Sequence, residues 1–214
     1  MRSKFDEQLA LLNRDLTKMG SLCEEALALA AKALANADGQ TAAKIAPIDS
    51  EIDQMERTTE SLCLKLLLQQ QPVARDLRQI SAALKMITDM ERIGDQASDI
   101  AEIIGFLNGR IGTDAQYICQ MAVAAMRMVT ESVEAYVKRD VAMAEATIQH
   151  DDVVDDLFLK VKESLIQMIS ENPKDGEYAL DLLMIAKYFE RIGDHATNIA
   201  EWVVFSVTGV HEQG

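Results

Sequence analysis

The sequence predicts an all-α protein, a tandem repeat of two antiparallel three-helix bundles with six long helices. Three observations predict this fold class. Hydrophobic residues make up 49% of the 214 residues but aromatic residues only 5%, a composition typical of packed helices. Apolar residues recur in alternating steps of three and four along most of the chain, as they do in the seam of a helical bundle. The segment ERIGDQASDIAE at 91–102 returns as ERIGDHATNIAE at 190–201, which indicates two units built to one plan.

The first half is expected to contain helices at about 4–36, 41–70 and 73–107. The seam of the first begins with Phe5, Leu9 and Leu12. Asp38-Gly39 breaks the apolar pattern, and Pro72 ends the second helix. Asn108-Gly109 and Gly112 separate the halves, so we predict one repeat at 1–109 and a second at 110–214.

The second half repeats the plan, with helices expected at about 113–138, 141–170 and 176–207. Asp140 corresponds to Asp38, and Asn172-Pro173 ends the fifth helix. Because the intervening loops are short, successive helices should lie antiparallel.

Composition excludes several function classes. The chain carries 21 Lys+Arg against 35 Asp+Glu, a net charge of −14, which argues against a nucleic-acid partner. It has no Gly-rich phosphate loop, nucleophile elbow or dinucleotide fingerprint. Three scattered cysteines suggest reduced thiols, and neither a signal peptide nor an apolar run of about 18 residues is evident. We therefore expect a cytoplasmic protein.

Acidic residues in the repeated segment share one helix face. Glu91, Asp95, Asp99 and Glu102 are spaced i, i+4, i+8 and i+11, as are Glu190, Asp194, Asn198 and Glu201. Glu91 occupies a position where the seam requires an apolar residue. Gly94 and Gly193 each cost about 1 kcal/mol of helix stability relative to Ala, which points to a neighbouring helix in close approach.

The preceding helix of each half also carries an acidic pair, Asp49 with Asp53 and Asp151 with Asp155. Asp53 lies 19 residues before Pro72 and Glu91 lies 19 after it. In an antiparallel hairpin these residues therefore stand at the same height. The register around Pro173 is equivalent, so each bundle should gather at least four carboxylates into one layer.

Carboxylates that are packed together and partly buried need a neutralising partner. Hard cations with oxygen ligands, such as Mg²⁺, Mn²⁺, Ca²⁺ or iron, would supply it. The scarcity of His makes Zn²⁺ a poor candidate, and the lack of a Glu-x-x-His pair argues against a di-iron oxidase. Salt-bridge layers formed with basic residues of the same helices are the alternative, and the spacing does not decide between them. Those basic residues are Arg75, Arg78, Lys85, Arg92, Lys187 and Arg191.

Two copies of Glu-Arg-Ile-Gly-Asp about 100 residues apart resemble the PhoU family of phosphate-uptake regulators. The segment ARDLRQISAALKMITDMERIGDQASDIA at 74–101 is also similar to that family. The resemblance implies a non-catalytic protein that lowers phosphate uptake and holds the phosphate-starvation response off. It further implies action through the ATP-binding subunit of a phosphate ABC transporter and a membrane sensor histidine kinase.

The resemblance also implies multinuclear metal clusters at the Glu/Asp-x-x-x-Asp motifs but does not identify the metal. We expect divalent or trivalent ions as cofactors, iron, Mn, Mg or Zn, with a metal that prefers hard oxygen ligands favoured. Asn198 departs from the pattern, since the first repeat has Asp99 there, which would weaken or alter the second cluster. The implied ligands are Asp49, Asp53, Glu91, Asp95, Asp99, Asp151, Asp155, Glu190, Asp194 and Asn198.

The resulting hypothesis is a metal-loaded adaptor, expected to be a homodimer, whose acidic faces dock on basic surfaces of its partners. It would touch a membrane only through those partners. Two other hypotheses stay open from the residues alone. One is a metal-dependent phosphohydrolase with a two-metal clamp, and the other is a purely structural helical module with salt-bridged acidic layers.

Overall fold

The computed structural model describes residues 2–70, 72–107, 109–111 and 115–210, and within them the chain forms helices and no strand. The first half contains α1 (Arg2–Asn36), α2 (Gly39–Ala42), α3 (Ile45–Gln70) and α4 (Ala74–Phe106). The second contains α5 (Gln116–Lys138), α6 (Val141–Gln149), α7 (Asp151–Glu171), the 3₁₀ turn η2 (Pro173–Asp175) and α8 (Gly176–Thr208). The predicted fold class is confirmed. Asn108 and Gly112 of the predicted linker lie outside the described residues, and the boundary between the repeats stays a prediction.

Two predicted helices are each divided in two. The helix expected at 41–70 is α2 followed by α3, because the chain tightens at Lys44, whose N–H donates to Thr41 O three residues back. The helix expected at 141–170 is α6 followed by α7, with the same tightening at His150, whose N–H donates to Thr147 O. Such 3₁₀ turns interrupt a helix without needing Gly or Pro, and the sequence gives no signal for the one at His150. The break at Lys44 is marked by Pro47, which lies in the first turn of α3.

The turn after the first helix of each half is built in the same way. Ala37 and Arg139 have left-handed backbone conformations, with φ of 53° and 55°. Asp38 and Asp140 follow them and cap the next helix, accepting from Gln40 N–H and Met143 N–H respectively. The correspondence between Asp38 and Asp140 is thereby confirmed.

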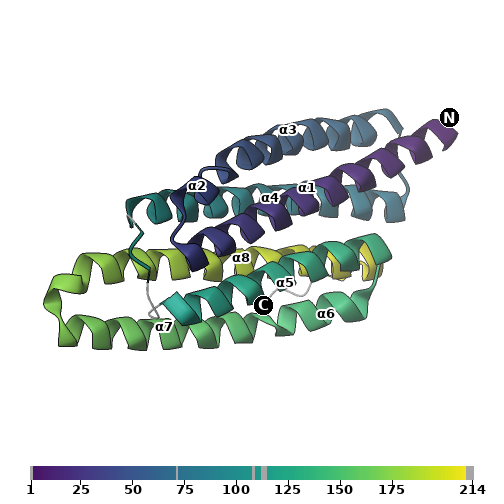
Figure 1. Cartoon of the computed structure of the whole chain (residues 1–214). Helices are drawn as coiled ribbons and strands as arrows, with labels where there is room; N and C mark the ends of the chain where they lie inside the picture. The colour runs from purple at the N-terminus through teal and green to yellow at the C-terminus, as the bar shows by residue number, and fades with distance from the viewer. Residues whose placement is uncertain (1, 71, 108, 112–114, 211–214) are drawn as a thin grey trace.

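The two bundles pack on each other through α4 against α8 and α1 against α5 (Figure 1). A single hydrophobic core runs through both bundles, so they form one body. At Gly20 of α1 an added Cβ would lie 2.7 Å from both methyl groups of Val133 on α5. Only glycine lets these two helices approach so closely.

In the part of the chain that is described, no helix has the length and apolar character needed to cross a membrane. Cys23, Cys63 and Cys119 are all free thiols, as the sequence suggested.

Candidate metal centre

The first acidic layer forms where α3 and α4 lie side by side. One carboxylate oxygen each from Asp49, Asp53 and Asp95 lies within 4.8 Å of the other two. All three side chains are half-buried. Because α3 and α4 are antiparallel and in the register set by Pro72, residues more than 40 positions apart in the chain converge. This is a donor set that a hard cation could use.

Asp49 is the least satisfied member of this layer. Its Oδ1 is buried and has no hydrogen-bond partner among the described residues. Burial and the neighbouring charge of Asp95 raise the pKa of Asp49, while a hydrogen bond from Ser98 opposes the shift. A Cβ at Gly94 would lie 2.8 Å from Asp49 Oδ1, so the glycine makes room for this carboxylate. A buried oxygen without a partner is what a cation would be expected to contact, and the layer therefore fits the metal that the resemblance implies.

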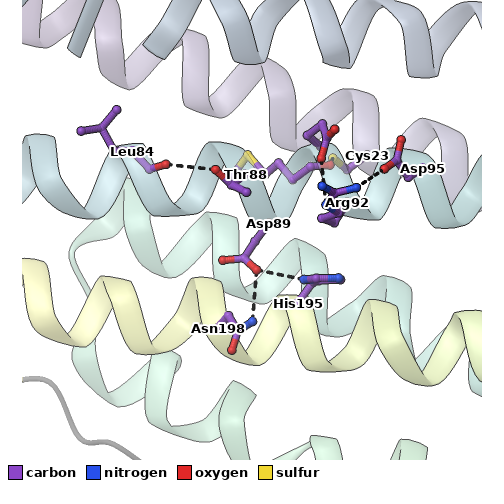
Figure 2. A network of polar contacts seen from close by, with 10 residues as sticks. Cys23, Leu84, Thr88, Asp89, Arg92, Asp95, His195 and Asn198 are labelled. Atoms are coloured by element: carbon purple, nitrogen blue, oxygen red, sulfur yellow. Dashed lines mark hydrogen bonds and ion pairs between the residues drawn. The ribbon is translucent and has the colours of Figure 1, made fainter. Parts of the chain in front are cut away.

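Glu91 and Arg92 flank the layer on α4. Burial, followed by the charge of Asp95, raises the pKa of Glu91. Arg92 contacts Glu91 at 3.3 Å and Asp95 at 2.9 Å, and Figure 2 shows the contact to Asp95. The salt-bridge alternative is thus partly present, but Arg92 does not reach Asp49. Arg92 is more than half exposed, so these pairs contribute little to stability.

Asp99 lies at the edge of the first layer and turns toward α8. It accepts a hydrogen bond from Tyr188, and burial is the main reason why the pKa of Asp99 is raised. Its charge also contributes to the raised pKa of Asp49, so it is close to the layer without being one of the three converging groups.

The second layer, on α7 and α8, gathers Asp151, Asp155, Glu190 and Asp194. Burial, followed by the charges of Asp194, Asp155 and Glu190, raises the pKa of Asp151 to about 6. The pKa values of Asp155 and Asp194 are also raised, mainly by burial. Gly193 repeats the role of Gly94, since its Cβ would lie 3.1 Å from Asp151 Oδ1.

Lys187 makes the second layer chemically different from the first. Its ammonium donates to Glu190 Oε2 and also lies 5.6 Å from the centre of the Phe158 ring. Among the described residues, three ligand atoms converge within 4.8 Å in the first layer and not in the second. A bound lysine already supplies part of the positive charge that the second layer needs.

Asn198 does not join the second layer. Its Nδ2 donates to Asp89 Oδ1 at 3.1 Å, and His195 Nδ1 lies 2.9 Å from the same oxygen (Figure 2). Asp89 belongs to α4 and is only 13% exposed, so its negative charge draws both polar groups of α8 into the interface between the bundles. A second histidine, His150, contacts Glu131 at 2.8 Å and lies apart from the converging groups of the first layer.

Sequence reasoning missed four residues that shape these layers: Glu56, Asp89, Ser98 and Tyr188. The charge of Glu56 adds to the raised pKa of Glu91, and its place seven residues after Asp49 on the same helix face could have revealed it. Asp89 and Tyr188 are repeat equivalents, 99 residues apart. Each hydrogen-bonds across the interface to the equivalent position of the other repeat, Asn198 or Asp99.

The PhoU domain profile matches two segments of the chain, residues 16–104 and 118–203. The chain belongs to the PhoU family. Each match contains one of the acidic layers, so the family resemblance drawn from the repeated motif is confirmed.

Individual relatives are similar over nearly their whole length. A phosphate-specific transport system accessory protein PhoU homolog of Clostridium acetobutylicum is 36% identical, over 97% of this chain and 96% of the relative. The crystal structure of PhoU from Pseudomonas aeruginosa superimposes with a TM-score of 0.93 at 33% identity, covering 96% of this chain and 100% of that one. The phosphate transport system regulatory protein PhoU from Streptococcus pneumoniae gives a TM-score of 0.88 at 26% identity, over 98% and 99% of the two chains.

Proposed function

We propose that this PhoU-family protein regulates phosphate uptake and the phosphate-starvation response as a metal-binding helical adaptor without catalytic activity. The names of its relatives, accessory and regulatory proteins of phosphate transport, support the coarse role. The finer role rests on the acidic layer: one carboxylate oxygen each of Asp49, Asp53 and Asp95 converge within 4.8 Å, and Asp49 also has a buried oxygen that no described residue satisfies.

In this proposal Asp49, Asp53 and Asp95 hold a divalent or trivalent cation, and Mg²⁺, Mn²⁺ and iron suit these oxygen ligands. The cation would supply the positive charge that lets the carboxylates stay ionised. Glu91 and Arg92 lie at the edge of the layer, where they adjust its net charge. Asp99 is assigned a secondary role, because its hydrogen bond to Tyr188 competes with a ligand role.

The second layer would hold a cation less tightly, through Asp151, Asp155, Glu190 and Asp194. Lys187 competes for Glu190, and the amide of Asn198 is engaged by Asp89. We therefore leave Asn198 out of the proposed ligand set.

The proposed partners are the ATP-binding subunit of a phosphate ABC transporter and a membrane sensor histidine kinase, with the protein acting from the cytoplasm and as a homodimer. A chain with a net charge of −14 would be steered to basic surfaces of such partners. Metal loading would change that charge locally and would stabilise the folded state by mass action.

The test uses the double variant Asp49→Asn/Asp95→Asn, which removes two charges while keeping side-chain shape. We expect its metal content, measured by elemental analysis after Mn²⁺ or Fe²⁺ loading, to fall by at least one equivalent. In a strain that lacks the native copy, the variant should also fail to repress a phosphate-starvation reporter.

The matched control is Glu145→Gln/Glu163→Gln, which removes two exposed charges from α6 and α7, away from the first layer. This control should retain metal content and repression. Unchanged metal content in the Asp49/Asp95 variant would reject the ligand assignment, and full repression by a metal-depleted variant would reject the link between metal and regulation.

A further inference from the structure

A second feature of the molecule lies outside both acidic layers. α1 and α4 begin and α5 ends at the same end of the molecule (Figure 1). Residues of these three segments line a cleft of about 840 Å³. The volume is in the range of small-molecule sites, which usually run from about 300 to 1,000 Å³. Inorganic phosphate alone would fill only a small part of it.

The cleft collects positive charge in an otherwise acidic protein. Four basic side chains line it against two acidic ones, Asp6 and Asp76, although acids outnumber bases by 35 to 21 in the whole chain. Of the four, Lys18 pairs with Glu51. The three arginines make no ion pair within 4 Å among the described residues: Arg14, Arg75 and Arg139. Arginines left unpaired in a chain rich in carboxylates are available to an external anion.

The equivalent position of the second repeat provides an internal contrast. Asp175 is the repeat equivalent of Asp76, and it is ion-paired with Arg110. The same arginine lies 4.2 Å from the centre of the Tyr178 ring, and Tyr178 is the repeat equivalent of Gln79. Arg110 is therefore held in an ion pair within the protein, whereas the three arginines of the cleft are not.

One wall of the cleft presents fixed hydrogen-bonding groups. Asn13 Oδ1 accepts from Gln79 Nε2 at 2.9 Å and from the Tyr136 hydroxyl at 2.8 Å. Tyr136 is only 7% exposed, so this pair of bonds fixes the orientation of the Asn13 amide. No described residue accepts from the remaining Asn13 Nδ2 group, which leaves a positioned donor at the cleft wall.

The first turn of α4 adds further donors. Val73 caps this helix without a side-chain hydrogen bond, and Val73 and Arg75 both line the cleft. The first N–H groups of a helix lack internal acceptors and favour an anion. Leu9 and Val137 supply apolar surface beside these polar groups. The cleft thus combines an anion-binding end with room for an organic body.

We propose that this cleft binds a phosphorylated organic molecule of nucleotide size. The arginines and the α4 first turn would contact the phosphate groups, and the Asn13 amide with the apolar wall would contact the organic part. The site is separate from the acidic layers, so this proposal does not depend on metal binding or on the partners proposed above.

The experiment is calorimetric titration of the full chain with ATP, ADP and AMP, in EDTA so that no metal bridges the nucleotide to the acidic layers. Inorganic phosphate and adenosine are titrated in parallel. We expect saturable binding of at least one nucleotide with one site per chain, and at least tenfold weaker binding of phosphate and of adenosine. Absence of saturable binding up to millimolar nucleotide would overturn the proposal, and so would equal affinity for ATP and phosphate.

The decisive variant is Arg14→Gln/Arg75→Gln/Arg139→Asn, where Asn is chosen because it tolerates the left-handed backbone at position 139. We expect it to bind nucleotide at least tenfold more weakly. The matched control, Arg127→Gln, removes an exposed arginine of α5 outside the cleft and should bind as the unchanged protein does. Circular dichroism confirms that the variant is folded, and undiminished binding by the folded triple variant would refute the assignment.

Discussion

The two acidic layers come from one repeated plan, yet they differ in the residues that surround them. In the first, Glu56 adds a carboxylate and Thr88 occupies the position that Lys187 has in the second. In the second, Phe158 replaces Glu56, and Lys187 lies against both Phe158 and Glu190. Three oxygens of the first layer converge, whereas in the second layer Lys187 supplies positive charge while Asp152 and Asp156 add negative charge. The comparison shows that the repeat brings the carboxylates of adjacent helices to the same height. The neighbouring side chains then determine how much positive charge a cation must add to each layer.

A second difference concerns the contacts that each layer makes with the other repeat. Asp89 of α4 accepts from Asn198 and contacts His195, whereas the equivalent Tyr188 of α8 donates one hydrogen bond to Asp99. Two polar groups of α8 therefore share the Asp89 carboxylate, whereas a single hydroxyl of α8 contacts the Asp99 carboxylate elsewhere in the interface.

The largest effect is expected from removing the Asp89 carboxylate. Asp89→Ala leaves the polar groups of His195 and Asn198 without their acceptor, which should cost about 2–3 kcal/mol of unfolding free energy. Tyr188→Phe removes a single hydrogen bond to the Asp99 carboxylate and should cost less, about 1.5 kcal/mol. Urea unfolding monitored by circular dichroism measures both, and equal costs would contradict the asymmetry.

The next largest effect is a difference in stability between alanine variants at Gly94 and Gly193. A Cβ at Gly94 would meet Asp49 Oδ1 at 2.8 Å and Ile52 Cδ1 at 3.1 Å, while at Gly193 only Asp151 Oδ1 is as close as 3.1 Å. Gly94→Ala should therefore destabilise the protein by about 2 kcal/mol through overpacking. In Gly193→Ala the gain in helix propensity, about 1 kcal/mol, should nearly cancel a milder contact. Thermal unfolding of both variants tests this order, and the reverse order would show that the first layer is the looser one.

Exchanging one neighbour should make the second layer resemble the first. Lys187→Thr introduces the residue found at the equivalent position 88 and frees Glu190 from its ammonium partner. We expect Mn²⁺ affinity at the second layer to rise about tenfold, equivalent to ~1.4 kcal/mol. Titration in an Asp49→Asn/Asp95→Asn background isolates the second layer, and an unchanged affinity would mean that Lys187 does not compete with the cation.

The smallest effect is a pH dependence of the metal-free protein. The pKa of Asp151 is raised from 3.8 to about 6 in the folded state, so the folded protein holds this proton where the unfolded chain has lost it. Stability should rise as pH falls from 7 toward 5 and stop rising near pH 4. Solvent screening of this half-buried group limits the gain to about 1 kcal/mol.

Chemical unfolding in EDTA across this pH range measures the effect. Asp151→Asn should flatten the profile more than Asp49→Asn does. A profile that Asp151→Asn leaves unchanged would assign the pH dependence to other carboxylates.

Much of the fold could be predicted because its causes are local. The apolar seam from Phe5 onward, the breaks at Asp38-Gly39 and Pro72, and the repeat at 91 and 190 fix the helices and their antiparallel order. The same register arithmetic predicted that Asp53 would come level with Glu91 and Asp49 with Asp95. Asp49, Asp53 and Asp95 do converge, whereas Glu91 is not among the converging groups.

What sequence reasoning missed depends on contacts between distant helices. The turn at His150 has no Gly or Pro to mark it, and the Pro47 that follows the turn at Lys44 was not read as the start of a new helix. Asn198 lies on the predicted helix face, but Asp89 attracts it to the interface. Sequence reasoning also did not predict the cleft, because its arginines come from segments that are far apart in the chain. Arg14 lies in α1, Arg75 in α4 and Arg139 in the turn after α5.

The hydrogen bond between Tyr188 and Asp99 has a consequence for how the halves communicate. Asp99 contributes to the electrostatic field at Asp49, while its partner Tyr188 lies two residues from Glu190 on the opposite helix. Neutralising the first layer would therefore alter the strength of a hydrogen bond that joins the two halves. Cation binding at the two acidic layers should thus be cooperative. The coupling would act through polarisation of the Tyr188–Asp99 hydrogen bond, without any large movement of the helices.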